Sequence, residues 1–144
     1  MGGGYAIIGD GFVLWLHSDE IISDGLVDYK IHCFNGEPKF ILVCANRFES
    51  TGMIEDFYST DWKRLTIRRP NTSISKKEMP RPELLDRMLD LSKVLSKDIP
   101  FLRTDYYIIN NHIYFGELTF YPAGGFRAFE PGEWDYTFGN WIKL

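Results

Sequence analysis

Hydrophobic residues of the β-branched and aromatic kinds are concentrated in short runs through the first half of the chain. Two of these runs, DYKIHCF at 28–34 and KFILVCANR at 39–47, flank the segment NGEP. Asn35-Gly36 in that segment is the dipeptide that two-residue hairpin turns favour. A third run, MIEDFYSTDWKRL at 53–65, is interrupted around Thr60-Asp61. The pattern predicts a hairpin followed by a third strand that breaks at this second turn.

The hydrophobic spacing becomes helical after a polar, proline-containing loop at 68–82. Pro82 stands at a favourable first helical position, and acids precede lysines along the segment, as the helix dipole prefers. We therefore expect a helix at 82–97 whose apolar face packs against a sheet. Its apolar residues recur at intervals of four, three and four positions: Leu84, Met88, Leu91 and Leu95.

A second hairpin is predicted at 101–120, where two apolar and aromatic runs flank Asn110-Asn111. A two-residue turn there would pair Ile109 with His112, and Asp105 and Glu117 would then face opposite sides of the sheet. A three-residue loop from Asn110 to His112 pairs Ile109 with Ile113 instead. We favour the longer loop because asparagine tolerates the left-handed conformation that such loops need.

In the favoured register, Asp105 lies directly opposite Glu117, and Arg103 lies opposite Thr119. Opposed carboxylates on neighbouring strands are about 5 Å apart at Cβ and repel each other, so a compensating charge is expected. A hard divalent cation or a nearby Arg or Lys, such as Arg103, would supply it. A protonated carboxylate pair that performs acid–base chemistry is a third alternative, although no histidine relay is apparent.

The order of three strands, a helix and two strands predicts an α+β fold, in which one main helix packs on one face of an antiparallel sheet. At 144 residues the chain has the length of one domain, and its 25% charged residues are ordinary for a soluble globular protein. The tail after residue 128 is rich in aromatic and turn residues, and no further helix is predicted there. Residues 1–26 carry only one short candidate strand, GFVLWL.

The net charge and the two cysteines limit the classes of function that the sequence favours. The net charge of -4 does not favour nucleic-acid binding, and the one basic cluster, WKRLTIRRP at 62–70, is expected to be solvated. No apolar run is long enough for a membrane span, and no signal peptide is recognised. Cys33 and Cys44 are expected to be buried free thiols, and the protein is expected to be cytoplasmic.

The segments RTDYY at 103–107 and YFGELTFYP at 114–122 resemble the C-terminal part of ATP-grasp proteins. The flanking segments, DYKIHCFNGEPKFILVCANR before them and FEPGEWDYTFGNWIKL after them, agree in order. More narrowly, the chain is similar to the TupA-like branch, which is linked to teichuronopeptide and other cell-surface polymer synthesis. The resemblance implies a domain at 27–144 equivalent to the C-terminal lobe of an ATP-grasp fold, preceded by a segment, 1–26, that does not match the family.

The resemblance also implies a metal site in the second hairpin. Asp105 and Glu117 would hold Mg²⁺ that bridges the phosphates of ATP. Thr119 stands where many ATP-grasp proteins carry a metal-binding asparagine, and its hydroxyl would take that place. Arg103 would contact the transferring phosphate or the acyl phosphate.

Three further residues are implied in nucleotide and substrate binding. Asp28 and Lys30 resemble the strand whose side chains reach the ribose and phosphates of ATP, and Lys30 would join Arg103 in acting on the reacting phosphate. Arg47 would face the carboxylate or phosphate of the substrate.

The function implied by the resemblance is that of an ATP- and Mg²⁺-dependent ligase. Such enzymes form an acyl phosphate, which an amine or similar nucleophile then attacks. The expected partners are a nucleotide and a carboxylate or sugar-linked substrate, with a homo-oligomer or companion subunit as a further possibility. Because the residues before Asp28 do not resemble the second nucleotide-binding lobe, weak or absent turnover is expected, and a non-catalytic binding or assembly module is the alternative.

Overall fold

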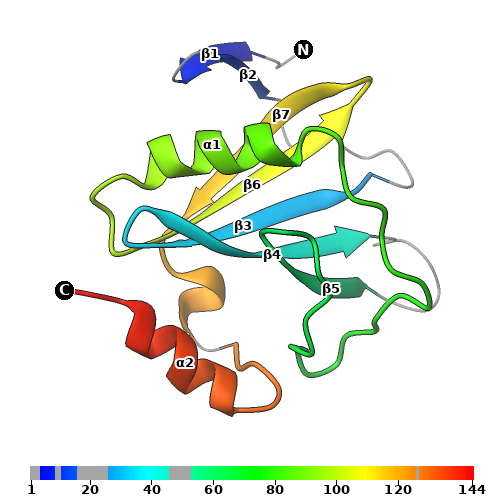
Figure 1. The fold of residues 1–144 in the computed structure, drawn as a ribbon, viewed down its shortest axis with the longest axis vertical. Coiled ribbons are helices and arrows are strands. Elements are labelled where there is room, and N and C mark those ends of the chain that lie inside the picture. Colours follow the sequence, from blue (N-terminus) through cyan, green and yellow to red (C-terminus); the bar gives the residue numbers. More distant parts are fainter. Residues whose placement is uncertain (1–3, 9–10, 16–25, 46–52, 126) are drawn as a thin grey trace.

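The structure is a computed structural model that describes residues 4–8, 11–15, 26–45, 53–125 and 127–144. These residues form an α+β fold, as the sequence predicts (Figure 1). None of the helices in these ranges is long and apolar enough to cross a membrane. The elements are β1 (Gly4–Ile8), β2 (Gly11–Trp15), β3 (Asp28–Phe34), β4 (Glu37–Ala45), β5 (Ile54–Ser59), α1 (Leu85–Ser96), β6 (Phe101–Ile109), β7 (His112–Thr119), a 3-10 turn (Pro122–Gly125) and α2 (Glu133–Trp141).

The strands form one sheet in the order β1-β2-β7-β6-β3-β4-β5. The five strands from β7 to β5 are antiparallel throughout, whereas β2 joins β7 in parallel. The turn at Asn35-Gly36 joins β3 to β4, and both residues have positive φ angles. The third predicted strand ends at Ser59, and the turn at Thr60-Asp61 follows it as expected. The predicted antiparallel sheet is therefore confirmed, with a parallel pairing added beyond β7.

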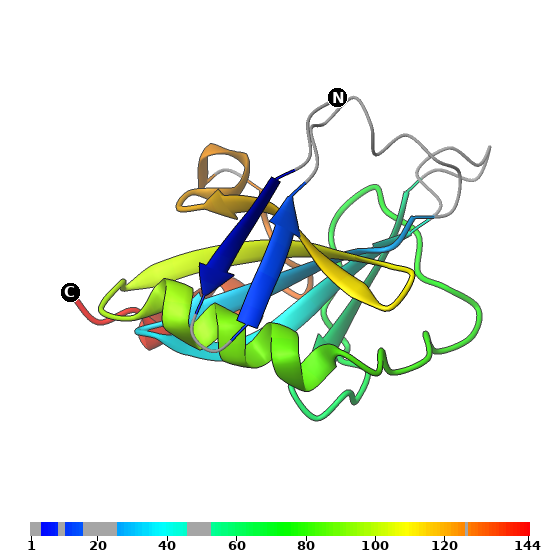
Figure 2. The same cartoon turned by 90° about the horizontal axis from the view of Figure 1, so that it is seen from above.

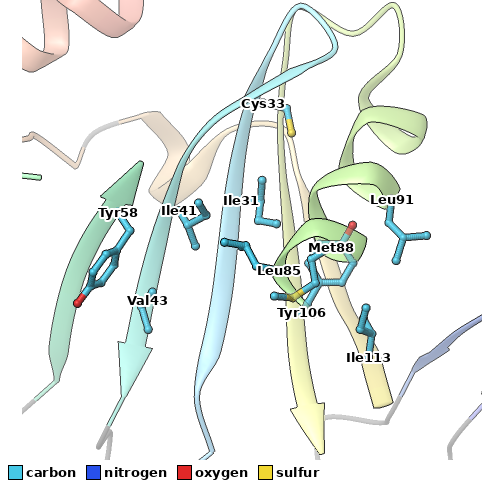
Figure 3. Close-up of a cluster of buried hydrophobic side chains, with 10 residues drawn as sticks. All are labelled: Ile31, Cys33, Ile41, Val43, Tyr58, Leu85, Met88, Leu91, Tyr106 and Ile113. Atoms are coloured by element: carbon cyan, nitrogen blue, oxygen red, sulfur yellow. The ribbon is translucent and has the colours of Figure 1, made fainter. Parts of the chain in front are cut away.

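One face of the sheet is covered by α1 (Figures 1 and 2). Alternate residues of the central strands, such as Ile31 and Ile41, point toward the helix and meet Met88 and Leu91 (Figure 3). The helix begins at Leu85, three residues later than predicted, because the turn before it is closed by a hydrogen bond from Leu85 N to the carbonyl of Pro82. The helical face predicted from leucine spacing is thus the one that forms the core.

The opposite face of the sheet is covered in part by α2, an element that the sequence pattern did not predict (Figure 1). Phe138 stacks on Phe40 of β4 with ring centroids 4.6 Å apart, and Trp134 and Trp141 flank Phe138. The spacing of these three aromatic residues, four and then three positions, is a helical one. Turn residues on either side hide this short pattern in the sequence.

The β6–β7 hairpin reaches the predicted pairing by a different route. Its turn has two residues, Asn110-Asn111, both with positive φ angles, so the predicted three-residue loop is wrong. A β-bulge between Asp105 and Tyr106 then shifts the register by one residue, with Gly116 as the extra residue on β7. A Cβ atom on Gly116 would lie 3.2 Å from the carbonyl oxygen of Asp105, which explains the glycine. Beyond the bulge, Asp105 lies opposite Glu117 and Arg103 opposite Thr119, as predicted.

Candidate functional site

Charged side chains gather on the face of β3, β6 and β7 that α1 does not cover. Asp28, Lys30 and His32 alternate along β3 and therefore point to the same side of the sheet. On β6, Arg103 lies opposite His32, and Asp105 lies opposite Lys30. The side chain of Asp105 is 1% exposed, and Lys30 and Arg103 are also buried. The strand periodicity and the pairing of β3 with β6 together bring these residues into one cluster.

The cluster is joined by short ion pairs. Lys30 Nζ lies 2.7 Å from Asp28 Oδ2 and 2.6 Å from Asp105 Oδ2. Arg103 donates from Nε to Asp105 Oδ1 and from Nη2 to Asp105 Oδ2, each over 2.7 Å. The same Nη2 also lies 2.7 Å from Glu117 Oε1. Asp105 is therefore held by two cations, and Arg103 bridges the two opposed carboxylates.

The charges in this network almost balance. Asp28, Asp105 and Glu117 carry three negative charges, and Lys30 and Arg103 carry two positive charges. Burial lowers the pKa of Lys30, but the charges of Asp105 and Asp28 outweigh it, so the pKa is raised overall. The pKa of Arg103 is likewise raised, since hydrogen bonds and charge from Asp105 exceed the effect of burial. Both cations are thus charged at neutral pH, and they supply the compensation that opposed carboxylates need.

In a comparison with known protein families, residues 15–143 match the family TupA-like ATPgrasp. The chain belongs to this family. No curated protein and no solved structure matches it. Family membership confirms the resemblance carried by the strand motifs, and it supports an ATP-grasp-like ligase domain with a nucleotide as substrate. ATP-grasp proteins in general bind ATP and a metal ion.

The described residues fit a magnesium ion that binds together with a nucleotide. They fit a metal site built from protein side chains alone less well. Nowhere in the described part of the chain do three His, Cys, Asp or Glu side chains converge as a metal site. Mg²⁺ is usually held by one or two carboxylates together with substrate phosphates and waters. Glu117, with a side chain 60% exposed, is a carboxylate open to solvent, whereas both oxygens of the opposed Asp105 already accept from Lys30 and Arg103.

Most residues that the ATP-grasp resemblance implied lie together in this cluster. Thr119, half-buried at the end of β7, lies opposite Arg103 and two positions beyond Glu117. Arg47 falls in 46–52, outside the residues that the structure describes. The remaining five are the members of the ion-pair network: Asp28, Lys30, Arg103, Asp105 and Glu117.

Sequence reasoning missed a neighbouring group of polar residues on the same face. Arg69 belongs to the basic cluster that was expected to be solvated, yet it is only 5% exposed. It lies over the ring of Phe129 at 4.9 Å and within 4.0 Å of Glu55, which also pairs with Arg127. His32 was interpreted as an isolated residue, although its place two positions after Lys30 puts it beside the ion pairs. For Arg69 the only sequence signal was the apolar Ile67 two positions before it.

Proposed function

We propose that the face of β3, β6 and β7 binds the phosphates of a magnesium nucleotide, as one lobe of an ATP-dependent ligase of the ATP-grasp type. The observation that carries the proposal is the position of Lys30 and Arg103. Both are buried cations on one sheet face, and both are held by carboxylates at distances of 2.6–2.7 Å. Such cations are oriented before any ligand arrives, which lowers the cost of binding an anion.

The two cations suit different parts of phosphate recognition. Arg103 presents a planar fork that matches two oxygen atoms, as it already does with Asp105. Lys30 provides a compact charge between Asp28 and Asp105. We propose that phosphate oxygens take over part of this hydrogen bonding, while Asp105 positions both cations.

In the proposed reaction, an oxygen of the substrate carboxylate attacks the terminal phosphorus of ATP, and the bond from that phosphorus to the ADP oxygen breaks. An amine or similar nucleophile then attacks the acyl carbon, and inorganic phosphate leaves. Arg103 and Lys30 stabilise charge on the transferring phosphate, which is the main requirement of phosphoryl transfer. Asp105 and Glu117 would hold the Mg²⁺, which neutralises phosphate charge when bound. Thr119 would stand beside them.

Further assignments belong to the same proposal. Asp28 would reach the ribose or the phosphates, and Arg47 would face the carboxylate or phosphate of the substrate. The substrates would belong to cell-surface polysaccharide or peptide-polymer synthesis, in the cytoplasm.

Calorimetric titration with ATP, in the presence and absence of Mg²⁺, tests the proposal. Glu117→Gln removes one metal-binding carboxylate, and we expect it to weaken MgATP binding by about tenfold or more, roughly 1.4 kcal/mol. Its effect should vanish with metal-free ATP, because the lost group acts through the metal. The matched control is Asp86→Asn, which changes an exposed carboxylate on α1 that pairs with Arg81. No binding of MgATP by the wild type at millimolar concentration would refute the proposal, as would equal binding by Glu117→Gln.

A further inference from the structure

A cavity of about 310 Å³ lies between the sheet and α2. Its volume is at the lower end of the range typical of small-molecule sites. The cavity adjoins the ion-pair cluster, because His32 in its wall is the cross-strand neighbour of Arg103. Its wall is rich in aromatic rings, among them those of Phe34, Phe40, Phe101, Phe129 and Phe138.

Two polar side chains in this apolar wall have hydrogen-bonding capacity that the described residues do not use. His32 is 1% exposed, and its Nδ1 lies 3.1 Å from the carbonyl oxygen of Lys30. A carbonyl only accepts, so Nδ1 carries the proton and Nε2 is left as an acceptor. Within the described residues Nε2 has no partner, and the same holds for the Nε–H of Arg69. Buried polar atoms of this kind normally have a partner, which points to a ligand or ordered water.

The charge of the cavity wall favours an anion. Glu55 is the carboxylate shared by Arg69 and Arg127, so two guanidinium groups face one negative charge. Arg127 takes the closer position, with Nη2 at 3.1 Å from Glu55, whereas Arg69 Nε is 4.0 Å away. Burial and the positive charges of Arg103 and Arg69 hold the pKa of His32 well below its usual range, so the ring is neutral and available to accept. Asp135 is the acid that lines the cavity itself, against the two cations Arg69 and Arg127, and it accepts a hydrogen bond from the backbone of Phe129.

We infer that this cavity binds a small molecule with a planar, apolar body, one anionic group and one hydrogen-bond donor. The anionic group pairs with Arg69, the body packs between the phenylalanine rings, and the donor reaches His32 Nε2. The anionic group is a carboxylate or a phosphate, since a guanidinium recognises either. Binding here does not depend on nucleotide binding at the ion-pair cluster.

Titration with four small probes tests each part of this assignment on the whole chain. We expect 4-hydroxyphenylacetate to bind best, because it carries the ring, the anion and the donor. Phenylacetate lacks the donor, and tyramine replaces the anion with a cation, so both should bind at least about tenfold more weakly. Phenyl phosphate, set against phenylacetate, shows which anion the cavity prefers. Absence of binding by all three anionic probes, or tighter binding of tyramine than of 4-hydroxyphenylacetate, would overturn the inference.

Variants place the binding in the cavity. Arg69→Gln should abolish the preference for anions, whereas Arg68→Gln, at the exposed neighbouring position, should leave binding unchanged. His32→Asn keeps a donor for the Lys30 carbonyl, but its shorter side chain leaves no acceptor at the position of Nε2, so it should abolish the difference between 4-hydroxyphenylacetate and phenylacetate. Circular dichroism verifies that the variants fold. If folded Arg69→Gln and His32→Asn both keep the wild-type selectivity among the probes, the assignment is contradicted.

A competition experiment separates this cavity from the proposed nucleotide site. Saturating MgATP should leave 4-hydroxyphenylacetate binding unchanged, and adenosine should not displace the probe. Displacement by adenosine would mean that the cavity is part of a nucleotide site and would refute the inference. Probe binding without MgATP binding would refute the proposed function alone.

Discussion

Lys30 on β3 and Asp105 on β6 lie directly opposite each other, and Lys30 Nζ donates to Asp105 Oδ2 over 2.6 Å. The two residues are 75 positions apart in the chain, and both are buried. The pair joins neighbouring central strands at the point where Arg103 reaches the same carboxylate. Stability and the proposed phosphate site therefore depend on one carboxyl group.

Replacing Asp105 with Asn should destabilise the fold strongly. The change leaves Lys30 and Arg103 as buried cations without their shared anion, and breaking a buried pair in this way costs about 3–5 kcal/mol. Urea unfolding followed by circular dichroism measures the free energy of unfolding. The control is Glu117→Gln, which removes a mostly exposed partner of Arg103 and should cost less than about 1 kcal/mol. Equal effects of the two substitutions would contradict the central position given to Asp105.

A Cβ atom added to Gly116 should disturb the bulge that aligns the site. In Gly116→Ala it would lie 3.0 Å from Tyr107 Cε2 and 3.2 Å from the carbonyl oxygen of Asp105, and backbone cannot easily yield. We expect a loss of about 1–3 kcal/mol in the free energy of unfolding, together with weaker MgATP binding. Thermal and urea unfolding measure the first effect, and calorimetry the second.

Gly139 provides the comparison, because an added Cβ there meets nothing within 4 Å and the residue lies inside α2. Gly139→Ala should leave stability unchanged or raise it by up to about 1 kcal/mol. If Gly116→Ala behaves in the same way, the bulge does not need glycine.

The hairpin also shows what a sequence can predict about such a site. Alternation along 101–109 places Arg103 and Asp105 on one face, and this part was predicted because strand periodicity is local. The same alternation of Asp28, Lys30 and His32 along 28–34 was not used. The register was predicted through the wrong turn, since the isolated Gly116 inside the strand pattern, which is a signal for a bulge, was not interpreted as one. The pairing of Asp105 with Glu117 came out right only because the bulge and the longer loop each add one residue.

The partners of the cluster were harder to predict. Lys30 compensates the charge of the opposed acids because β3 pairs with β6. These two strands lie far apart in the sequence, so the local pattern did not predict the contact. The burial of Arg69 depends on Phe129 and α2, which follow it by about sixty positions and fold over it. Without Phe129 and α2 to cover it, a basic cluster next to polar residues would be exposed to solvent. Composition alone therefore predicted the wrong environment for Arg69.

Acid should destabilise the protein partly through His32. Burial, followed by the charges of Arg103 and Arg69, lowers the pKa of this residue in the folded state below its unfolded value. The unfolded chain therefore binds a proton first, and stability falls as the pH drops below about 6.5, by up to about 1.4 kcal/mol per pH unit. His32→Asn should remove this contribution. Urea unfolding between about pH 7 and 5 measures it, and parallel curves for the two proteins would show that His32 is not the source.

The two cysteines should react with a thiol reagent only after unfolding. Neither Cys33 nor Cys44 is in a disulfide, as predicted, and both are buried. Burial raises the pKa of Cys33 to about 11, so little reactive thiolate forms near pH 8. In denaturant, Ellman's reagent should label both thiols. In buffer, it should label neither thiol over the same reaction time. Rapid labelling of Cys33 in buffer would mean that the α1 face of the sheet opens readily.

The most direct test of the phosphate-binding face is an amide proton–nitrogen spectrum of the labelled protein during titration with MgATP. We expect the largest shifts at 28–32, 103–105 and 116–119, together with a shift of the Arg103 Nε–H as phosphate replaces carboxylate. The amides of α1 should change little, because that helix lies on the other face of the sheet. Shifts confined to other parts of the chain, or none at saturating MgATP, would contradict the account.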